Sequence, residues 1–305
     1  MTLTRRDFIS RSAAGSVAGA LGLLPSLAPA QIAMGDMQID VVSDGSLTLP
    51  GGFIFDPMPK DALAPILEKY QLSQDVLTPQ CNVTLLRMGD RVVLFDVGSG
   101  PDFAPNAGTL LTSLEGLGVT PEDVTDVVFT HAHPDHLWGL LDDFDDPLFT
   151  NAQYMIGQAE WDYWTNPNTV SEIGDARASF AVGAARRLAM IEDSVTFFKD
   201  GDEVMPGVAA RASFGHTPGH MALEVRNGSE AVMILGDSIG NHHVAFERPE
   251  WASGSDQDAE TAIKTRLSLL NQAATDKMRV IGYHLPGGVG YVDKTASGYS
   301  FVAGG

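Results

Sequence analysis

The chain has 305 residues, of which 44% are hydrophobic and 19% are charged, and its formal net charge is −20 at pH 7. This ordinary globular composition predicts a folded protein with a substantial core and excludes a disordered or low-complexity chain. The strong negative charge argues against nucleic acids and anionic membranes as partners, because both repel an acidic surface.

The first thirty residues differ from the rest of the chain and predict an export signal. Arg5 and Arg6 form a twin arginine, a stretch of small apolar residues follows at 13–27, and Ala28-Pro29-Ala30 has the pattern of a cleavage site. The apolar stretch is too short and too rich in Gly and Ala for a membrane anchor. This segment resembles a twin-arginine (Tat) signal, which implies contact with the Tat export machinery and a periplasmic or secreted location.

The expected division of the chain is a signal peptide at 1–30 and a single folded domain at 31–305, with no stable membrane anchor after cleavage. The signal carries a net charge of +2, so its removal leaves −22. Cys81 is the only cysteine, which leaves no partner for an internal disulfide. It begins a strand-like run, which favours a small buried hydrophobe over a nucleophile or a metal ligand.

Hydrophobic periodicity predicts the elements of the first half of the domain. Residues 37–49 are typical of two strands around an Asp44-Gly45 turn, and residues 51–57 predict a loop with exposed aromatic side chains. Further expected elements are a helix at 62–70, a hairpin of strands at 83–87 and 92–96, and a helix at 110–117.

The most informative stretch is 130–136, which holds three of the eight histidines together with one aspartate. A buried strand is predicted just before it, and a helix can begin just after it. Side chains alternate along an extended segment, so His131 and His133 point the same way and can hold one metal ion. Asp135 and His136 follow and reach a second position nearby. Imidazole and carboxylate groups are ligands that zinc prefers, so this spacing predicts a metal site.

The second half of the chain repeats this association of a strand with a ligand type. After helices between about 159 and 192, strands are predicted at 208–214, 231–235 and 278–283. Each of them is followed by a His or Asp, namely His216, Asp237 and His284. Unrelated surface residues would show no preference for strand ends, so we expect one site along the edge of a sheet sandwich.

Together these residues resemble the metallo-β-lactamase superfamily. The shared features are the H-x-H-x-D-H pattern at 131–136, the G-H-T-P-G sequence around His216, the Gly236-Asp237 pair and His284. The resemblance implies an α+β fold, a four-layer αββα sandwich of two mixed sheets flanked by helices. It also implies two divalent metal ions, with Zn²⁺ expected and Mn, Co or Fe as alternatives.

The resemblance assigns the metal ligands position by position. One metal takes His131, His133 and His216, the other takes Asp135, His136 and His284, and Asp237 bridges the two. Such a pair lowers the pKa of a shared water to roughly 7 and provides a bridging hydroxide as the nucleophile. Asp135 and Asp237 are therefore the expected catalytic carboxylates.

Four further side chains are candidates for the surroundings of the metals. His220 lies in the same turn as His216, and we expect it behind the ligands, with the reverse assignment of these two histidines left open. His242 is a candidate for the substrate pocket, with a plain structural role equally open for it. Trp164 matches an aromatic pocket position of the family and Phe53 is a looser candidate, while core packing stays open for both.

Several segments resemble the methyl parathion hydrolase and quorum-quenching lactonase branch, namely 44–50, 160–164, 283–290 and 298–302. This resemblance implies an exported dinuclear hydrolase of a small hydrophobic ester, lactone or phosphotriester, and it leaves open whether the chain forms a homodimer. The alternatives are a glyoxalase II-like thioesterase, a mononuclear-iron persulfide dioxygenase, and a non-catalytic periplasmic metal-binding protein.

Overall fold

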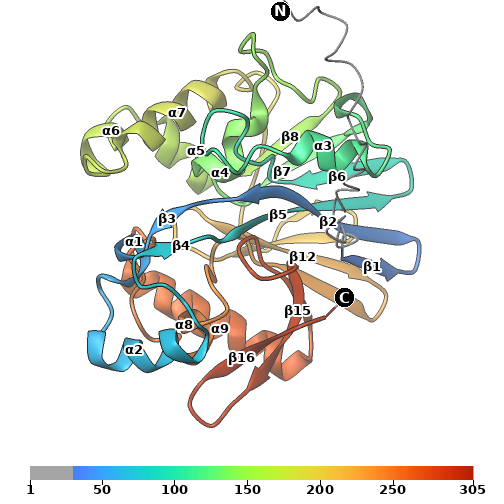
Figure 1. Cartoon of the computed structure of the whole chain (residues 1–305). Coiled ribbons are helices and arrows are strands. Elements are labelled where there is room, and N and C mark those ends of the chain that lie inside the picture. Colours follow the sequence, from blue (N-terminus) through green and yellow to red (C-terminus); the bar gives the residue numbers. More distant parts are fainter. Residues whose placement is uncertain (1–29, 305) are drawn as a thin grey trace, which may run out of the picture.

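The computed structural model describes residues 30–304. The predicted signal peptide at 1–30 therefore lies outside the described residues except for Ala30, whose carbonyl accepts a hydrogen bond from Val41 N at 2.9 Å. Figure 1 shows four layers, in which two sheets lie face to face and helices cover the outer face of each. The predicted α+β fold, a four-layer αββα sandwich, is confirmed.

The first sheet has seven strands in the order β1-β2-β5-β6-β7-β8-β9. Their bounds are Gln31–Met34 (β1), Met37–Ser46 (β2), Gln80–Met88 (β5), Arg91–Phe95 (β6), Asp126–Phe129 (β7), Gln153–Gly157 (β8) and Thr196–Phe198 (β9). The first four strands of this order pair antiparallel, and β6 to β9 pair parallel. The predicted hairpin is the pair β5 and β6, and every residue of β7 is buried, as expected of a parallel strand covered on both faces.

The second sheet has seven strands in the order β10 to β16. Their bounds are Glu203–Met205 (β10), Val208–Ala212 (β11), Met221–Asn227 (β12), Glu230–Ile234 (β13), Arg279–Ile281 (β14), Val289–Lys294 (β15) and Tyr299–Ala303 (β16). Only β13 and β14 pair parallel within it. The three strands predicted in the second half are thus β11, β13 and β14.

Helices cover the outer faces of both sheets (Figure 1). On the first sheet lie Leu110–Glu115 (α3), Pro134–Leu137 (α4), Gln158–Thr165 (α5), Thr169–Glu172 (α6) and Ala178–Ala189 (α7), with short 3₁₀ turns at Pro121–Asp123 (η1) and Trp138–Leu140 (η2). On the second sheet lie Val244–Glu247 (α8) and Ala259–Asp276 (α9). Within residues 30–304, no helix combines the length and apolar character needed to cross a membrane.

The main core lies between the two sheets. Leu86 and Phe95 of the first sheet share one buried cluster with Leu223 and Val225 of β12. The intervening Ala222 faces the other way and belongs to the cluster under α9. This alternation follows from the two-residue period of a strand, and it lets one strand bury apolar side chains on both faces.

The prediction of a turn at Asp44-Gly45 is wrong. Strand β2 runs through both residues, and its register against β5 shifts between Ser43 and Ser46. Asp44 is fully buried, and its carboxylate accepts hydrogen bonds from the backbone N–H groups of Ser99 and Leu110 at 2.9 Å each. Asp44 therefore anchors two distant loops to β2, a role that donors far away in the sequence create.

Residues 49–77, which we call the cover segment, form an insertion between β2 and β5. Short strands Leu49–Pro50 (β3) and Val76–Leu77 (β4) pair at its base and enclose the helices Gly52–Phe55 (α1) and Lys60–Lys69 (α2). The loop predicted at 51–57 therefore contains a helical turn. Side chains of α1 and α2 pack with Val244 of α8 in a cluster of their own, which fastens the cover segment to the second sheet's helices.

Candidate metal centre

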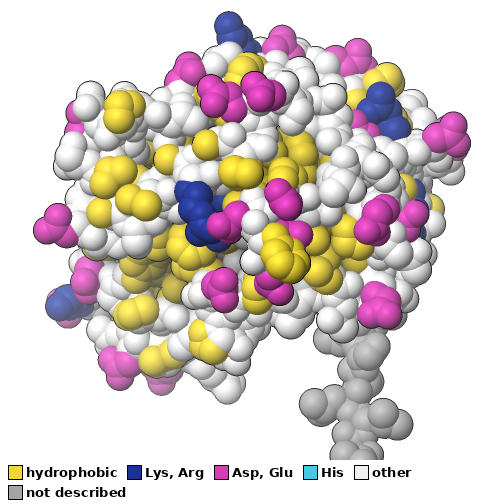
Figure 2. Space-filling model, turned by 90° about the horizontal axis from the view of Figure 1, so that it is seen from above, with side chains coloured by type: hydrophobic (Ala, Val, Ile, Leu, Met, Phe, Trp, Pro, Cys, Tyr) yellow, Lys and Arg dark blue, Asp and Glu magenta, His cyan; other side chains and the backbone are white. Residues whose placement is uncertain are grey.

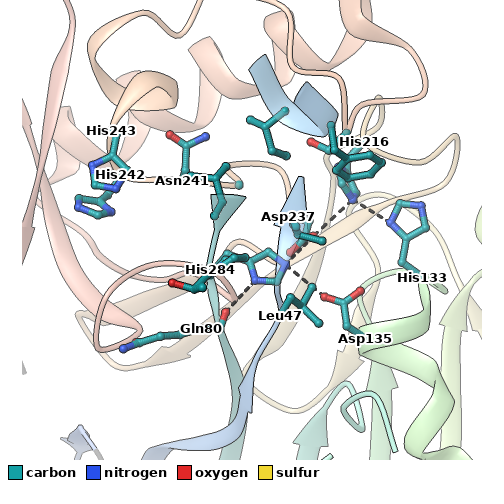
Figure 3. A pocket seen from close by; sticks show the side chains of 18 of the residues that line it. Leu47, Gln80, His133, Asp135, His216, Asp237, Asn241, His242, His243 and His284 are labelled. Carbon is teal, nitrogen blue, oxygen red and sulfur yellow. Dashed lines mark hydrogen bonds and ion pairs between the residues drawn. The ribbon is translucent and has the colours of Figure 1, made fainter. Parts of the chain in front are cut away.

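Metal-binding side chains from four strand ends meet at one end of the sandwich (Figure 3). The segment 131–136 follows β7, His216 follows β11, Asp237 follows β13, and His284 follows β14. Figure 3 labels five of these residues around one space. Because the segment 131–136 belongs to the first sheet and the other three residues to the second, the site joins both halves of the sandwich.

Three histidines form the first set, His131, His133 and His216. His133 Nδ1 lies 3.0 Å from His131 Nε2 and 2.9 Å from His216 Nε2. Burial, with a contribution from neighbouring histidines, lowers the pKa of His131 and of His133 well below the usual value. Both rings are therefore neutral and offer lone pairs, which is the form that binds a metal.

Two carboxylates and two histidines form the second set, Asp135, His136, Asp237 and His284. His284 Nε2 lies 3.2 Å from Asp135 Oδ2 and 3.2 Å from Asp237 Oδ2. The same Asp237 oxygen lies 3.4 Å from His216 Nε2 of the first set. Asp237 is thus placed between the two sets, where a bridging ligand has to be.

The donor atoms fit divalent cations. Within each set the ligand atoms all lie within 4.8 Å of one another. Asp135 Oδ2, His136 Nε2 and Asp237 Oδ1 are buried and have no hydrogen-bond partner in the described part of the chain. Buried polar atoms without partners are costly, and a bound metal ion removes that cost. Burial opposes ionisation of Asp237, but His284 and His136 outweigh it and hold its pKa well below the usual value.

The ligand histidines also have partners for the ring nitrogen that faces away from the centre. Asp96 Oδ2 accepts from His136 Nδ1 at 2.8 Å, and Gln80 O accepts from His284 Nδ1 at 2.7 Å. Asp256 Oδ1 lies 3.3 Å from His216 Nδ1. Such partners fix the ring orientation and direct the other nitrogen to the metal. None was predicted as a site residue, although Asp96 ends a predicted strand.

Glu160 is another residue that the sequence does not reveal as part of the site. Its side chain is fully buried and accepts hydrogen bonds from Ala132 N at 2.9 Å and Gly219 N at 3.0 Å. It also accepts from Thr217 Oγ1 at 2.7 Å and Trp164 Nε1 at 2.6 Å. One carboxylate therefore ties the turn of His131 and His133 to the turn of His216.

His220 lies behind the metal centre, where it was expected. Its Nε2 accepts a hydrogen bond from Asp237 N at 3.0 Å, and its Nδ1 lies 2.7 Å from Ser213 Oγ. Burial lowers its pKa to about 3, so the ring stays neutral. Both ring nitrogens are used by the chain, which leaves His216 as the histidine of this turn that joins the first set.

The cavity over the centre has a volume of about 290 Å³. Its floor contains His133, Asp135, His216, Asp237 and His284, and its walls contain Leu47, Leu49, Phe53, Ile54, Leu72, Leu77, Phe103 and Phe180. The cover segment supplies much of this apolar wall. Among the described residues that line the cavity, Arg177 is the single Lys or Arg.

The pocket candidates separate into two groups. Phe53 and His242 line the cavity. Trp164 does not line the cavity, because its indole is buried and packs edge-on behind His133, with ring centroids 5.6 Å apart. The hydrogen bond from its Nε1 to Glu160 holds it there, so Trp164 supports a ligand and does not face the substrate.

Known structures share this fold over most of the chain. AidC, a dizinc quorum-quenching lactonase in complex with the product N-hexanoyl-L-homoserine, superposes with a TM-score of 0.85 at 24% identity and covers 91% of this chain and 98% of its own. The hydrolase AbOPH of the β-lactamase superfamily gives 0.82 at 27% identity, covering 90% and 97%. The fold and the His/Asp site together define a metallo-hydrolase.

The family follows from the sequence comparisons. The model of the metallo-beta-lactamase superfamily matches residues 77–284. Metallo-beta-lactamase domain-containing protein 1 of Xenopus laevis is 30% identical over 217 residues, which are 68% of this chain and 74% of that protein. The chain belongs to the metallo-β-lactamase superfamily, as the resemblance of its motifs implied.

Proposed function

We propose that the chain is a dinuclear hydrolase of small, neutral, hydrophobic lactones, esters or phosphotriesters. His131, His133 and His216 would hold one metal ion, Asp135, His136 and His284 would hold the other, and Asp237 would serve both. The observation that carries this proposal is the position of Asp237, which lies 3.4 Å from a histidine of one set and 3.2 Å from a histidine of the other, at the floor of the cavity.

Two divalent ions, with zinc favoured by the imidazole and carboxylate donors, supply a water of lowered pKa and a Lewis acid for the substrate oxygen. The chain's own residues prepare this chemistry. Asp135 and Asp237 keep ionised carboxylates at the cavity floor, because nearby histidines outweigh burial and lower the pKa of each. Ionised carboxylates are the form that holds a divalent cation.

The cavity walls support a neutral and hydrophobic substrate. Leucine, isoleucine and phenylalanine side chains surround the floor, and such a wall favours an apolar group while it excludes bulk water. The product bound to AidC is N-hexanoyl-L-homoserine, so an N-acyl homoserine lactone is the first substrate to test.

The test combines metal content with hydrolysis. Elemental analysis of the purified chain should give two divalent ions, and a panel of a lactone, an aryl ester and a phosphotriester should show turnover. Asp237→Ala should lose metal and reduce kcat/KM by more than the roughly 10–100-fold that loss of a ligand's outer partner causes. Asp193→Ala, at an exposed aspartate, is the matched control.

Three outcomes would contradict the proposal. One iron per chain with persulfide oxidation would establish the dioxygenase. Turnover of a glutathione thioester alone would establish the thioesterase. Two metals without turnover on the whole panel would establish a metal-binding protein without catalysis.

We also propose that residues 1–30 are a Tat signal and that the domain acts in the periplasm or outside the cell. The support is the twin arginine followed by a small apolar stretch and an Ala-Pro-Ala site. Replacing Arg5 and Arg6 by Lys should keep the full-length chain in the cytoplasm, as seen by immunoblotting of cell fractions. Unchanged export of that variant would show that another signal is used.

A further inference from the structure

The cavity has a polar end that the proposed metal chemistry does not use. Asn241, His242 and His243 line it. In Figure 3 they lie on the other side of Asp237 and His284 from His133 and His216. The end of the cavity away from the histidine set is therefore polar, although most of the wall between is apolar.

The amide of Asn241 has a fixed orientation. Its Oδ1 accepts hydrogen bonds from Val244 N at 2.8 Å and Ala245 N at 3.3 Å, at the start of α8. An amide NH₂ group has no lone pair for these donors, so the oxygen must point to the helix. The structure gives the Nδ2 group no acceptor within residues 30–304, and this group is left as a donor at the cavity wall.

The two histidines beside it are uncharged. Their ring centroids lie 3.5 Å apart, and the Tyr70 ring of the cover segment lies 4.7 Å from His243. Burial lowers the pKa of His242 to about 4 and, with His242 nearby, lowers that of His243 to about 3. His243 Nδ1 is buried and has no hydrogen-bond partner in the described part of the chain.

The charges around this end do not suit an anion. Beside the histidines lies a closed pair, in which Lys69 and the Tyr70 hydroxyl both bind Glu247. The charges of Lys69 and Glu247 cancel, so this pair offers a carboxylate or phosphate no free cation. A wholly apolar group is also a poor fit, because it would leave the Asn241 donor without a partner.

We propose that Asn241, His242 and His243 form a recognition subsite for an uncharged hydrogen-bond acceptor, such as a carbonyl, on the acyl chain of the substrate beyond its amide. This inference rests on the proposed function, since it names a substrate feature read by the same cavity. A site that hydrogen-bonds such a group discriminates against the analogue that lacks it, because the Asn241 donor then has no partner in the complex.

The test uses two lactones of equal length, N-hexanoyl-homoserine lactone and its 3-oxo counterpart, which adds one carbonyl to the acyl chain. The wild type should prefer the 3-oxo lactone in kcat/KM. Asn241→Asp keeps an oxygen for the start of α8 but removes the NH₂ donor, so the preference should fall by about 10-fold, the effect of one hydrogen bond. His243→Phe, which keeps a ring against Tyr70, should lower it in the same direction.

Asn166→Asp is the matched control, because Asn166 Oδ1 also accepts a backbone hydrogen bond, from Asn168 N, but at an exposed position. Its preference should equal that of the wild type. Equal losses for both lactones in Asn241→Asp would overturn the subsite.

Calorimetric binding of the same two lactones separates this inference from the proposed function. If the wild type hydrolyses neither lactone, the proposed function fails for this substrate class. Tighter binding of the 3-oxo lactone by the wild type, lost in Asn241→Asp, would still establish the subsite. Equal binding of both lactones by the wild type would refute it.

Discussion

At the scale of single residues, buried carboxylates determine where the metal ligands point. Asp96 orients His136, Asp256 contacts His216, and Glu160 joins the two turns that carry the first histidine set. These carboxylates lie outside the two ligand sets. Their contribution is the position of each ring, which a metal centre needs before any ion binds.

Glu160→Gln should weaken metal binding without touching a ligand. Four donors point at the Glu160 carboxylate. A glutamine would turn its NH₂ group, itself a donor, towards some of these donors, and their hydrogen bonds would be lost. We expect metal affinity to fall by roughly 10–100-fold, measured by competition with a chromogenic chelator. Glu172→Gln, at an exposed glutamate of α6, should leave the affinity unchanged. If Glu160→Gln binds metal with wild-type affinity, the turns that carry the histidines keep their positions without the Glu160 carboxylate.

At the scale of elements, the cover segment decides the shape of the cavity. It supplies apolar wall residues, and the loop of residues 253–256, which Arg177 holds in turn, fastens it over the site. Gly254 N donates to Ile54 O at 3.0 Å, and Arg177 Nη2 donates to Gly254 O at 2.7 Å and Ser255 O at 3.1 Å. The Arg177 guanidinium also lies 5.7 Å from the centroid of the Phe53 ring. Arg177 thus links the start of α7 to the cover segment.

Arg177→Met should raise KM for a hydrophobic substrate by about 5–10-fold, with a smaller change in kcat, because it removes hydrogen bonds that hold the wall but no group at the cavity floor. Steady-state kinetics at full metal occupancy measures both constants. Arg186→Met on the same helix is the control, since Arg186 pairs with Asp145 at the surface. A fall in kcat alone would place the effect at the metal centre through the 253–256 loop.

At the scale of the whole molecule, the metal centre connects the two sheets. One group of ligands follows β7 of the first sheet, and His216, Asp237 and His284 follow strands of the second. Metal ions bound there would join the two sheets at this end of the sandwich.

The surface of the molecule is acidic. Figure 2 shows Asp and Glu side chains spread over the face seen from above, with few Lys or Arg among them. This charge agrees with a small neutral substrate and not with a polyanion.

Metal removal should lower the thermal stability of the folded chain. A ligand present at about 1,000 times its Kd stabilises the native state by roughly 4 kcal/mol, so a chelator should lower Tm on the order of 10 °C. Differential scanning calorimetry with and without chelator measures this shift, and added Zn²⁺ should restore it. Asp237→Ala should show a smaller shift. An equal Tm with and without chelator would mean that bound metal does not contribute to the stability of the folded chain.

Local motifs and their resemblance to a known family were enough to predict the fold class, the family and the residues of the two clusters. His131, His133, Asp135 and His136 are close in sequence, so the geometry of a strand and the turn after it places them together whatever surrounds them. His216, Asp237 and His284 were predictable for a similar reason, because each follows a recognisable buried strand.

The surroundings of these clusters could not be predicted from local sequence. Asp44 has the local sequence of a turn, yet donors from Ser99 and Leu110 make it a buried anchor. Trp164 matches an aromatic pocket position of the family, yet its hydrogen bond to Glu160 holds it behind His133. The polar end of the cavity depends on which amide atom of Asn241 reaches α8. In each case the deciding partner comes from packing or from a hydrogen bond in the folded chain, which local spacing does not encode.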